Sequence, residues 1–156
     1  MTIATPSPVR TAASVLLALY LVLLAGLTLR PVSEDTNQSL RVNLRPFATI
    51  GPALRLGPGS FPFRVLVGNF VAFVPLGILL PLVRRRTGPA FVVLVGIGLS
   101  STIELAQLAI SLALGYGYRS ADIDDVIVNT AGTMAGVALV LIVRFAARLM
   151  AFAQGR

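Results

Sequence analysis

The sequence predicts an all-α, polytopic membrane protein, with about four transmembrane helices in a compact bundle that forms one domain over residues 1–156. Hydrophobic residues make up 56% of the chain and charged residues 12%, about half of the roughly 25% usual in soluble domains. The mean hydropathy is +0.87. Four runs are long enough to cross a bilayer, which takes about 20 mostly apolar residues. Since a backbone in lipid must satisfy its own hydrogen bonds, each run is predicted to be a helix.

The first two runs cover residues 11–29 and 65–83, and neither contains a charge. The first is longer than the roughly 7–15 residues of a signal-peptide core and lacks an Ala-x-Ala cleavage site, so we interpret it as a retained helix. The third run, residues 90–112, contains a single charge, Glu104, and the fourth, residues 126–143, contains none.

Four helices place both termini on one side of the membrane. The short link between the second and third helices contains the arginine triplet 84–86, and further arginines lie near both termini. Because arginines in short loops favour the cytoplasmic side, we predict a multi-pass plasma-membrane protein with both termini in the cytoplasm.

The longest connection, residues 30–64, is called the outer loop, and residues 40–143 are the predicted core of the domain. Five prolines and three glycines in the loop exclude a long regular helix. Its apolar residues argue against free disorder. We expect part of the loop to lie at the outer membrane interface.

Composition narrows the chemistry. The chain has no cysteine, histidine or lysine, and its 13 basic residues are all arginine, which stays charged near neutral pH. Acid–base chemistry therefore depends on Glu, Asp or Tyr. The arginines flank apolar runs instead of forming one dense patch, so we predict no nucleic-acid partner. No metal-ligand spacing or cofactor motif is present, and we predict neither a metal nor a cofactor.

Polar residues from distant segments are predicted to meet in one layer of the bundle. They lie near the outer ends of the second, third and fourth helices, in the turn before the fourth, and in the outer loop. We take these as the candidate binding residues: Asn43, Arg45, Asn69, Glu104, Gln107, Arg119, Asp122, Asp125 and Asn129.

Glu104 is the main candidate, because a charge inside a bilayer is costly and normally faces the bundle interior with a partner. The nearest predicted partners are Arg119 and Arg45. Glu104 and Gln107 are three residues apart and share a helix face, and the same stripe is extended by Ser100 and Ser111.

Structural interpretations stay open beside the functional ones. Asp122 is also a candidate N-cap of the fourth helix, with Asp125 at N3 as in a capping box. Glu104 is also interpretable as half of a structural ion pair. Asn69 and Asn129 also fit simple interhelical hydrogen bonds.

Gly132 and Gly136 form a GxxxG pattern, which allows two helices to pack closely. The pattern fits packing within the bundle and also a homodimer through Gly132 and Gly136.

Three blocks of sequence resemble the VanZ-like family of bacterial membrane proteins. Residues 43–47, N-L-R-P-F, are similar to the family's N-L-x-P-F, and residues 69–77 are similar to N-x-x-x-F-x-P-x-G. Residues 101–107 and 119–132 resemble the run that contains E-x-x-Q, R-x-x-D-x-[DN]-D and N-x-x-G. The stretch between Gln107 and Arg119 is longer here than in the family.

The resemblance implies a bacterial plasma-membrane protein, and the family's namesake is associated with low-level resistance to the glycopeptide teicoplanin. Our leading hypothesis is an envelope protein without a demonstrable reaction. It would bind a membrane lipid, a lipid-linked precursor or another amphiphile in an outward-facing polar pocket. Arg45 and Arg119 would engage an anionic head group, and the acids would orient them or bind a cationic part.

Two alternatives belong to other classes of protein. One is an intramembrane enzyme that acts on a lipid-linked substrate, with Glu104, Asp122 and Asp125 as candidate acid–base or metal-binding groups. The other is a small proton-coupled transporter with Glu104 as the relay.

Overall fold

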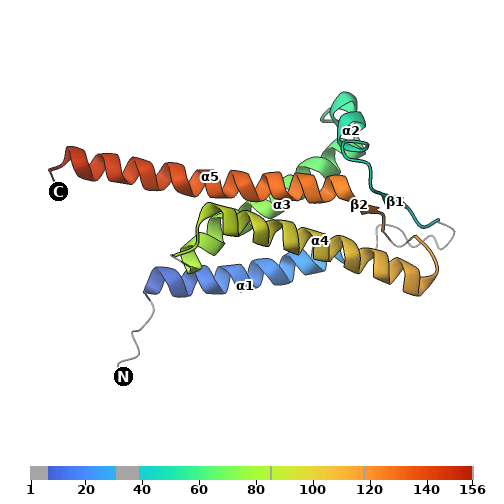
Figure 1. Ribbon diagram of the computed structural model, residues 1–156, viewed down its shortest axis with the longest axis horizontal. Coiled ribbons are helices and arrows are strands. Elements are labelled where there is room, and N and C mark those ends of the chain that lie inside the picture. The colour runs from blue at the N-terminus through green and yellow to red at the C-terminus, as the bar shows by residue number, and fades with distance from the viewer. Residues whose placement is uncertain (1–6, 31–38, 85, 118, 156) are drawn as a thin grey trace, which may run out of the picture.

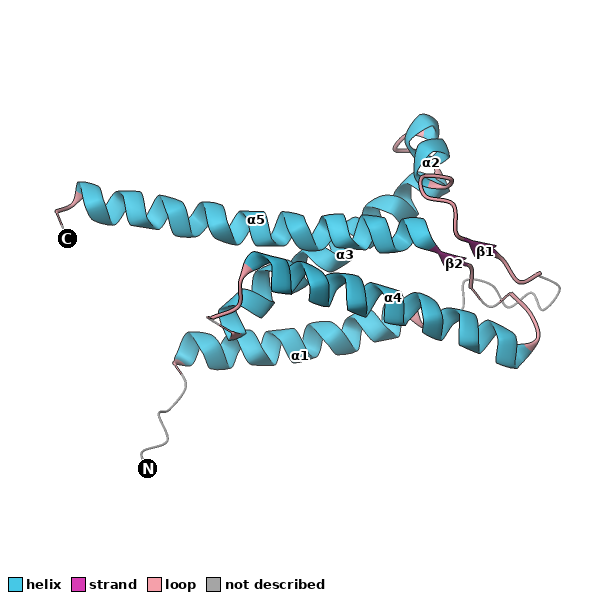
Figure 2. Ribbon diagram, in the orientation of Figure 1, coloured by secondary structure: helices cyan, strands magenta, loops and turns pink. Residues whose placement is uncertain are grey.

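Helices dominate the computed structural model (Figure 1; Figure 2). Within its described part, four helices are long and apolar enough to cross a membrane, which confirms the predicted fold class. The described residues are 7–30, 39–84, 86–117 and 119–155.

The four long helices begin and end close to the predicted positions, except at the end of the last one. They are α1 (Pro8–Thr28), α3 (Phe61–Val83), α4 (Pro89–Leu114) and α5 (Ile123–Ala153). A proline stands in the first turn of α1, α3 and α4, where its missing N–H is not needed. At the other end of α4, Gly115 adopts the left-handed conformation (φ 75°) that ends a helix at low cost.

Helix α5 extends ten residues beyond the predicted end at residue 143. Residues 144–153 contain two arginines but no proline or glycine, and most of them are good helix formers. A helix of 31 residues is about 46 Å long at 1.5 Å per residue, whereas the hydrocarbon core of a bilayer is about 30 Å thick. One end of α5 therefore projects past the span.

The described part of the outer loop holds two short elements. Strand β1 (Val42–Asn43) pairs in parallel with β2 (Ala121–Asp122), which leads directly into α5. Helix α2 (Ile50–Leu56) is seven residues long, in agreement with the prediction that proline and glycine exclude a long helix here.

The two ends of the bundle differ. The start of α1 and the end of α5 lie at one end, the terminal end (Figure 1). Elements β1, β2 and α2 lie at the other, the loop end. Arg84 and Arg86 belong to the α3–α4 link, and Arg85 of the predicted triplet lies outside the described residues. The side on which the termini lie stays a prediction.

Close packing of α3 on α5 depends on glycine. Gly132 and Gly136 lie against the backbone carbonyls of Phe70 and Val74, with no room for a Cβ atom. Gly77 of α3 meets the α5 backbone in the same way. The GxxxG pattern thus serves packing within the chain, and the homodimer stays a prediction.

Helix α1 packs on α3 through a small apolar core. Leu24, Phe73 and Leu76 are buried together. The Tyr20 hydroxyl donates to the carbonyl oxygen of Ala72 at 2.9 Å. These contacts attach the first helix to the bundle that carries the candidate site.

Candidate functional site

Asp122 is the point at which the outer loop, α4 and α5 meet. Its side chain accepts the N–H of Asp124 at 2.9 Å and so caps α5, as one interpretation of the sequence predicted. The same carboxylate oxygen accepts Asn43 Nδ2 at 2.8 Å, across the β1–β2 pair. The backbone N–H of Asp122 donates to Glu104 Oε2 at 2.8 Å.

Glu104 is buried, with 8% of its surface exposed, and it lies inside the bundle as predicted. The arginine partner predicted for it is not found among the described residues. Instead, Glu104 accepts the backbone N–H of Asp122. In a capping box, an acid at N3 of α5 would accept this N–H. The guanidinium group of Arg119 donates to the carbonyl oxygen of Arg30 at 3.1 Å, while its charge still acts on Glu104 and Asp125.

One face of α4 carries a buried polar stripe, made of Ser100, Glu104, Gln107 and Ser111. Gln107 Nε2 donates to the carbonyl oxygen of Thr28, which ties α4 to the end of α1. Ser111 bonds both the backbone N–H and the carbonyl oxygen of Arg119, which holds the turn before β2.

Asparagines join the stripe to the other helices. Asn129 is 4% exposed and donates to Ser100 Oγ at 2.8 Å, which confirms the predicted interhelical bond. Its Oδ1 atom has no partner among the described residues. Asn69 of α3 directs its side chain toward the carboxylate of Asp125.

Asp124 is the residue that the sequence analysis missed. It is 1% exposed, and its carboxylate accepts the backbone N–H groups of Phe47 (2.5 Å), Thr49 (2.7 Å) and Ile50 (3.2 Å), together with the Thr49 hydroxyl (2.8 Å). Phe47 has a positive φ of 66°, which is uncommon for a residue with a side chain. Asp124 therefore holds the outer loop in this conformation. One feature of the sequence could have indicated this role: three aspartates stand at the start of α5, although a single one is enough for an N-cap.

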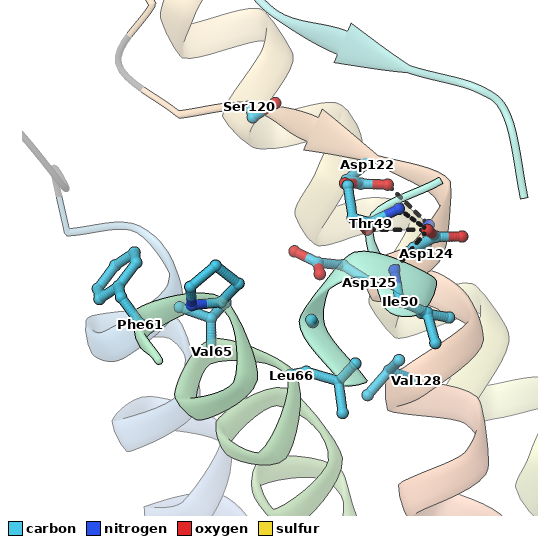
Figure 3. A pocket seen from close by; sticks show the side chains of 12 residues that line it. Thr49, Ile50, Phe61, Val65, Leu66, Ser120, Asp122, Asp124, Asp125 and Val128 are labelled. Atoms are coloured by element: carbon cyan, nitrogen blue, oxygen red, sulfur yellow. Dashed lines mark hydrogen bonds between the residues drawn. The ribbon is translucent and has the colours of Figure 1, made fainter. Parts of the chain in front are cut away.

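A cleft of about 300 Å³ opens between α2, the start of α3 and the start of α5 (Figure 3). Asp122 and Asp125 lie on one side of it, together with Asp124, whose carboxylate already accepts the outer-loop donors. The carboxylate of Asp125 projects away from the group of hydrogen bonds around Asp124 (Figure 3). The rest of the wall is largely apolar, and we refer to this space as the acidic cleft. Its apolar lining residues are Ile50, Ala53, Phe61, Pro62, Val65, Leu66 and Val128.

The predicted site residues divide into two groups. Asp122 and Asp125 line the acidic cleft. Five others stand behind it in the hydrogen-bonded and electrostatic network, namely Asn43, Asn69, Glu104, Arg119 and Asn129.

The remaining two candidates lie apart from the cleft. Gln107 anchors α1. The Arg45 side chain is exposed, and it does not line the cleft. Within the described part of the chain, no three acids are grouped as metal ligands.

The chain is similar to known proteins over most of its length. A family model described as VanZ/LLP1 matches residues 17–144. The chain is 34% identical over 132 residues to Protein VanZ of Enterococcus faecium, an alignment that covers 80% of this chain and 70% of that protein. No solved structure matches the chain.

Proposed function

The chain belongs to the VanZ/LLP1 family, and from that membership we propose that it is an envelope protein that binds an amphiphile in the acidic cleft and contributes to glycopeptide resistance. As a family member with four candidate membrane spans, it is a bacterial membrane protein. Resistance is the association that the family resemblance implies, and the ligand class comes from the cleft.

The observation that carries the proposal is the composition of the cleft wall. Asp122 and Asp125 stand on one side with Asp124, whose carboxylate is taken up by the outer loop. Thr49 and Ser120 are the other polar residues of the wall, and apolar side chains of α2, α3 and α5 form the rest. Such a wall suits a ligand that combines a hydrocarbon chain with a cationic group, since a carboxylate forms its strongest hydrogen bonds with charged donors. No arginine is among the described residues of this wall, which favours a cationic head group over the anionic one first expected from Arg45 and Arg119.

Several apolar residues that line the cleft or lie in the outer loop are exposed. Phe61 is 61% exposed and Val65 is 40% exposed, both at the start of α3. Phe47 and Leu54 of the outer loop are exposed as well. An exposed apolar patch of this kind is typical of a lipid or ligand contact. A chain inserted here would reach the cleft directly from the membrane interface.

The buried network supports this function by positioning the two cleft acids. Asp122 is held by Asn43, Asp124 and Glu104, and Asp125 is approached by Asn69. Glu104 is mostly buried and does not line the cleft. We therefore assign it a positioning role and favour binding over acid–base catalysis.

A susceptibility assay tests the proposal. A glycopeptide-sensitive bacterium that expresses the chain should become less susceptible to teicoplanin. Replacement of both cleft acids (Asp122→Asn with Asp125→Asn) should abolish that effect, whereas the exposed-residue control Arg55→Gln should keep it. Membrane abundance is measured by immunoblot in parallel. Full protection by the double variant at normal abundance would contradict the proposal.

A further inference from the structure

Two arginine-lined clefts lie at the terminal end of the bundle, on the side away from the acidic cleft. The first, about 400 Å³, is lined by Val9, Pro81, Leu82, Arg144 and Arg148. The second, about 330 Å³, is lined by Arg10, Val83, Arg84, Arg86 and Thr87. The two clefts are neighbours. Val9 of α1 and Leu82 of α3 line the first cleft, and the next residue of each helix, Arg10 and Val83, lines the second.

Two arginines of the clefts, Arg144 and Arg84, have side-chain contacts that orient them. Arg144 and Arg148 are one helical turn apart on α5 and share a face. Arg144 donates to the carbonyl oxygen of Pro81 at 3.3 Å, which uses one of its five N–H groups. The guanidinium carbon of Arg84 lies 5.4 Å from the centre of the Phe91 ring. An arginine that only sets the membrane topology needs no defined side-chain contact, whereas Arg144 and Arg84 each have one.

Positive charge at this end is not balanced by acids of the described chain. The described acids lie at the loop end, at the start of α5 and late in α4. None of them lines either arginine cleft. Arginine stays charged at any physiological pH, so the two clefts attract an anion.

The walls indicate which anion. Val9, Pro81 and Leu82 stand beside Arg144 and Arg148, so the charged groups adjoin apolar surface of α1 and α3. A soluble anion would leave that surface uncovered, whereas a phospholipid covers it with acyl chains. We propose that the arginine clefts bind the phosphodiester head group of an anionic phospholipid in the leaflet at the terminal end. This site is separate from the acidic cleft and does not depend on its function.

Native mass spectrometry of the full chain tests the site. The protein is equilibrated with equal amounts of phosphatidylglycerol and phosphatidylcholine, and the bound lipids are counted. Wild type should prefer phosphatidylglycerol. Arg144→Gln with Arg148→Gln should reduce that preference by about twenty-five-fold, since each arginine near an anionic surface contributes about fivefold. The matched control is Arg41→Gln with Arg55→Gln, two exposed arginines from the loop end, and it should bind like wild type.

A lysine double variant and a competition with inorganic phosphate complete the experiment. Arg144→Lys with Arg148→Lys keeps the charge and should retain most of the preference, even if the glutamine pair folds poorly by circular dichroism. Excess inorganic phosphate should not displace the lipid. Equal binding of the two lipids by wild type, an unchanged preference in a folded glutamine variant, loss of the preference in the folded lysine variant, or full displacement by phosphate would each overturn the proposal.

Discussion

The carboxylate of Glu104 on α4 accepts the backbone N–H of Asp122, the N-cap of α5, at 2.8 Å. In a capping box, an acid at N3 of the same helix satisfies that N–H. Here an acid from another helix satisfies it, so the start of α5 is completed only when α4 is packed beside it. The bond therefore couples the position of Asp122 in the acidic cleft to the buried stripe on α4.

Two substitutions of Glu104 test whether its hydrogen-bond acceptor or its negative charge stabilises the fold. Glu104→Gln keeps an oxygen that can accept the Asp122 N–H, and no arginine among the described residues is left unpaired by the loss of charge. We expect Gln to keep thermal stability close to wild type in detergent. Glu104→Leu removes the acceptor and should cost about 1–3 kcal/mol, the usual penalty for a buried group without a partner. Equal destabilisation by Gln and Leu would show that the charge itself holds the fold.

Asp124 is predicted to control the outer loop. Asp124→Ala leaves the N–H groups of Phe47, Thr49 and Ile50 without their shared acceptor, at a local cost of about 3 kcal/mol. Hydrogen exchange at these three amides should then become roughly a hundredfold faster, while α3 and α5 stay protected. Asp125→Ala is the control, because no described loop amide donates to Asp125. Unchanged exchange in Asp124→Ala would contradict the assigned role.

The α3–α5 contact gives a prediction about glycine. Gly132→Ala places a methyl group against the Phe70 carbonyl and should destabilise the fold by about 1–3 kcal/mol. Gly68→Ala on α3 meets nothing within 4 Å and should be neutral or slightly stabilising, because alanine favours helix. Thermal unfolding of both variants decides the matter. Unchanged stability of Gly132→Ala together with weaker self-association would assign the pattern to a homodimer.

The topology is testable because the chain contains no cysteine. Ser39→Cys, at the loop end, should react with an impermeant maleimide added to intact cells. Gln154→Cys, at the terminal end, should react only after the cells are opened. The physical reason is the arginine-rich α3–α4 link, which favours the cytoplasmic side. The reverse labelling pattern would overturn the predicted orientation.

Hydropathy and periodicity were enough to predict the helices and the buried stripe. Long uncharged runs have few alternatives to helix in lipid, and the spacing of Ser100, Glu104, Gln107 and Ser111 determines one face. The cost of burying polar groups then directs that face inward. The stripe is buried in the structure as this reasoning predicts.

The partners within the site were harder to predict. Glu104 was paired with an arginine on grounds of charge, but the nearby donor is a backbone N–H, which any residue can supply. Asp124 was passed over because three acids in four residues look alike in one sequence. The bonds of Asp124 reach residues 74 to 77 positions away, and local patterns carry no information about such contacts.

Ligand binding in the acidic cleft is most directly measured by fluorescence. The chain has no tryptophan, so Phe61→Trp places a single probe in the cleft wall, and Phe152→Trp, at the far end of α5, is the control. In nanodiscs, dodecylammonium should change the Phe61→Trp emission saturably, and dodecyl sulfate should not. Asp122→Asn with Asp125→Asn should weaken the response at least about tenfold, as expected for lost charge-assisted hydrogen bonds. Equal, non-saturating responses at both probe positions, or equal affinity for the two amphiphiles, would contradict the account.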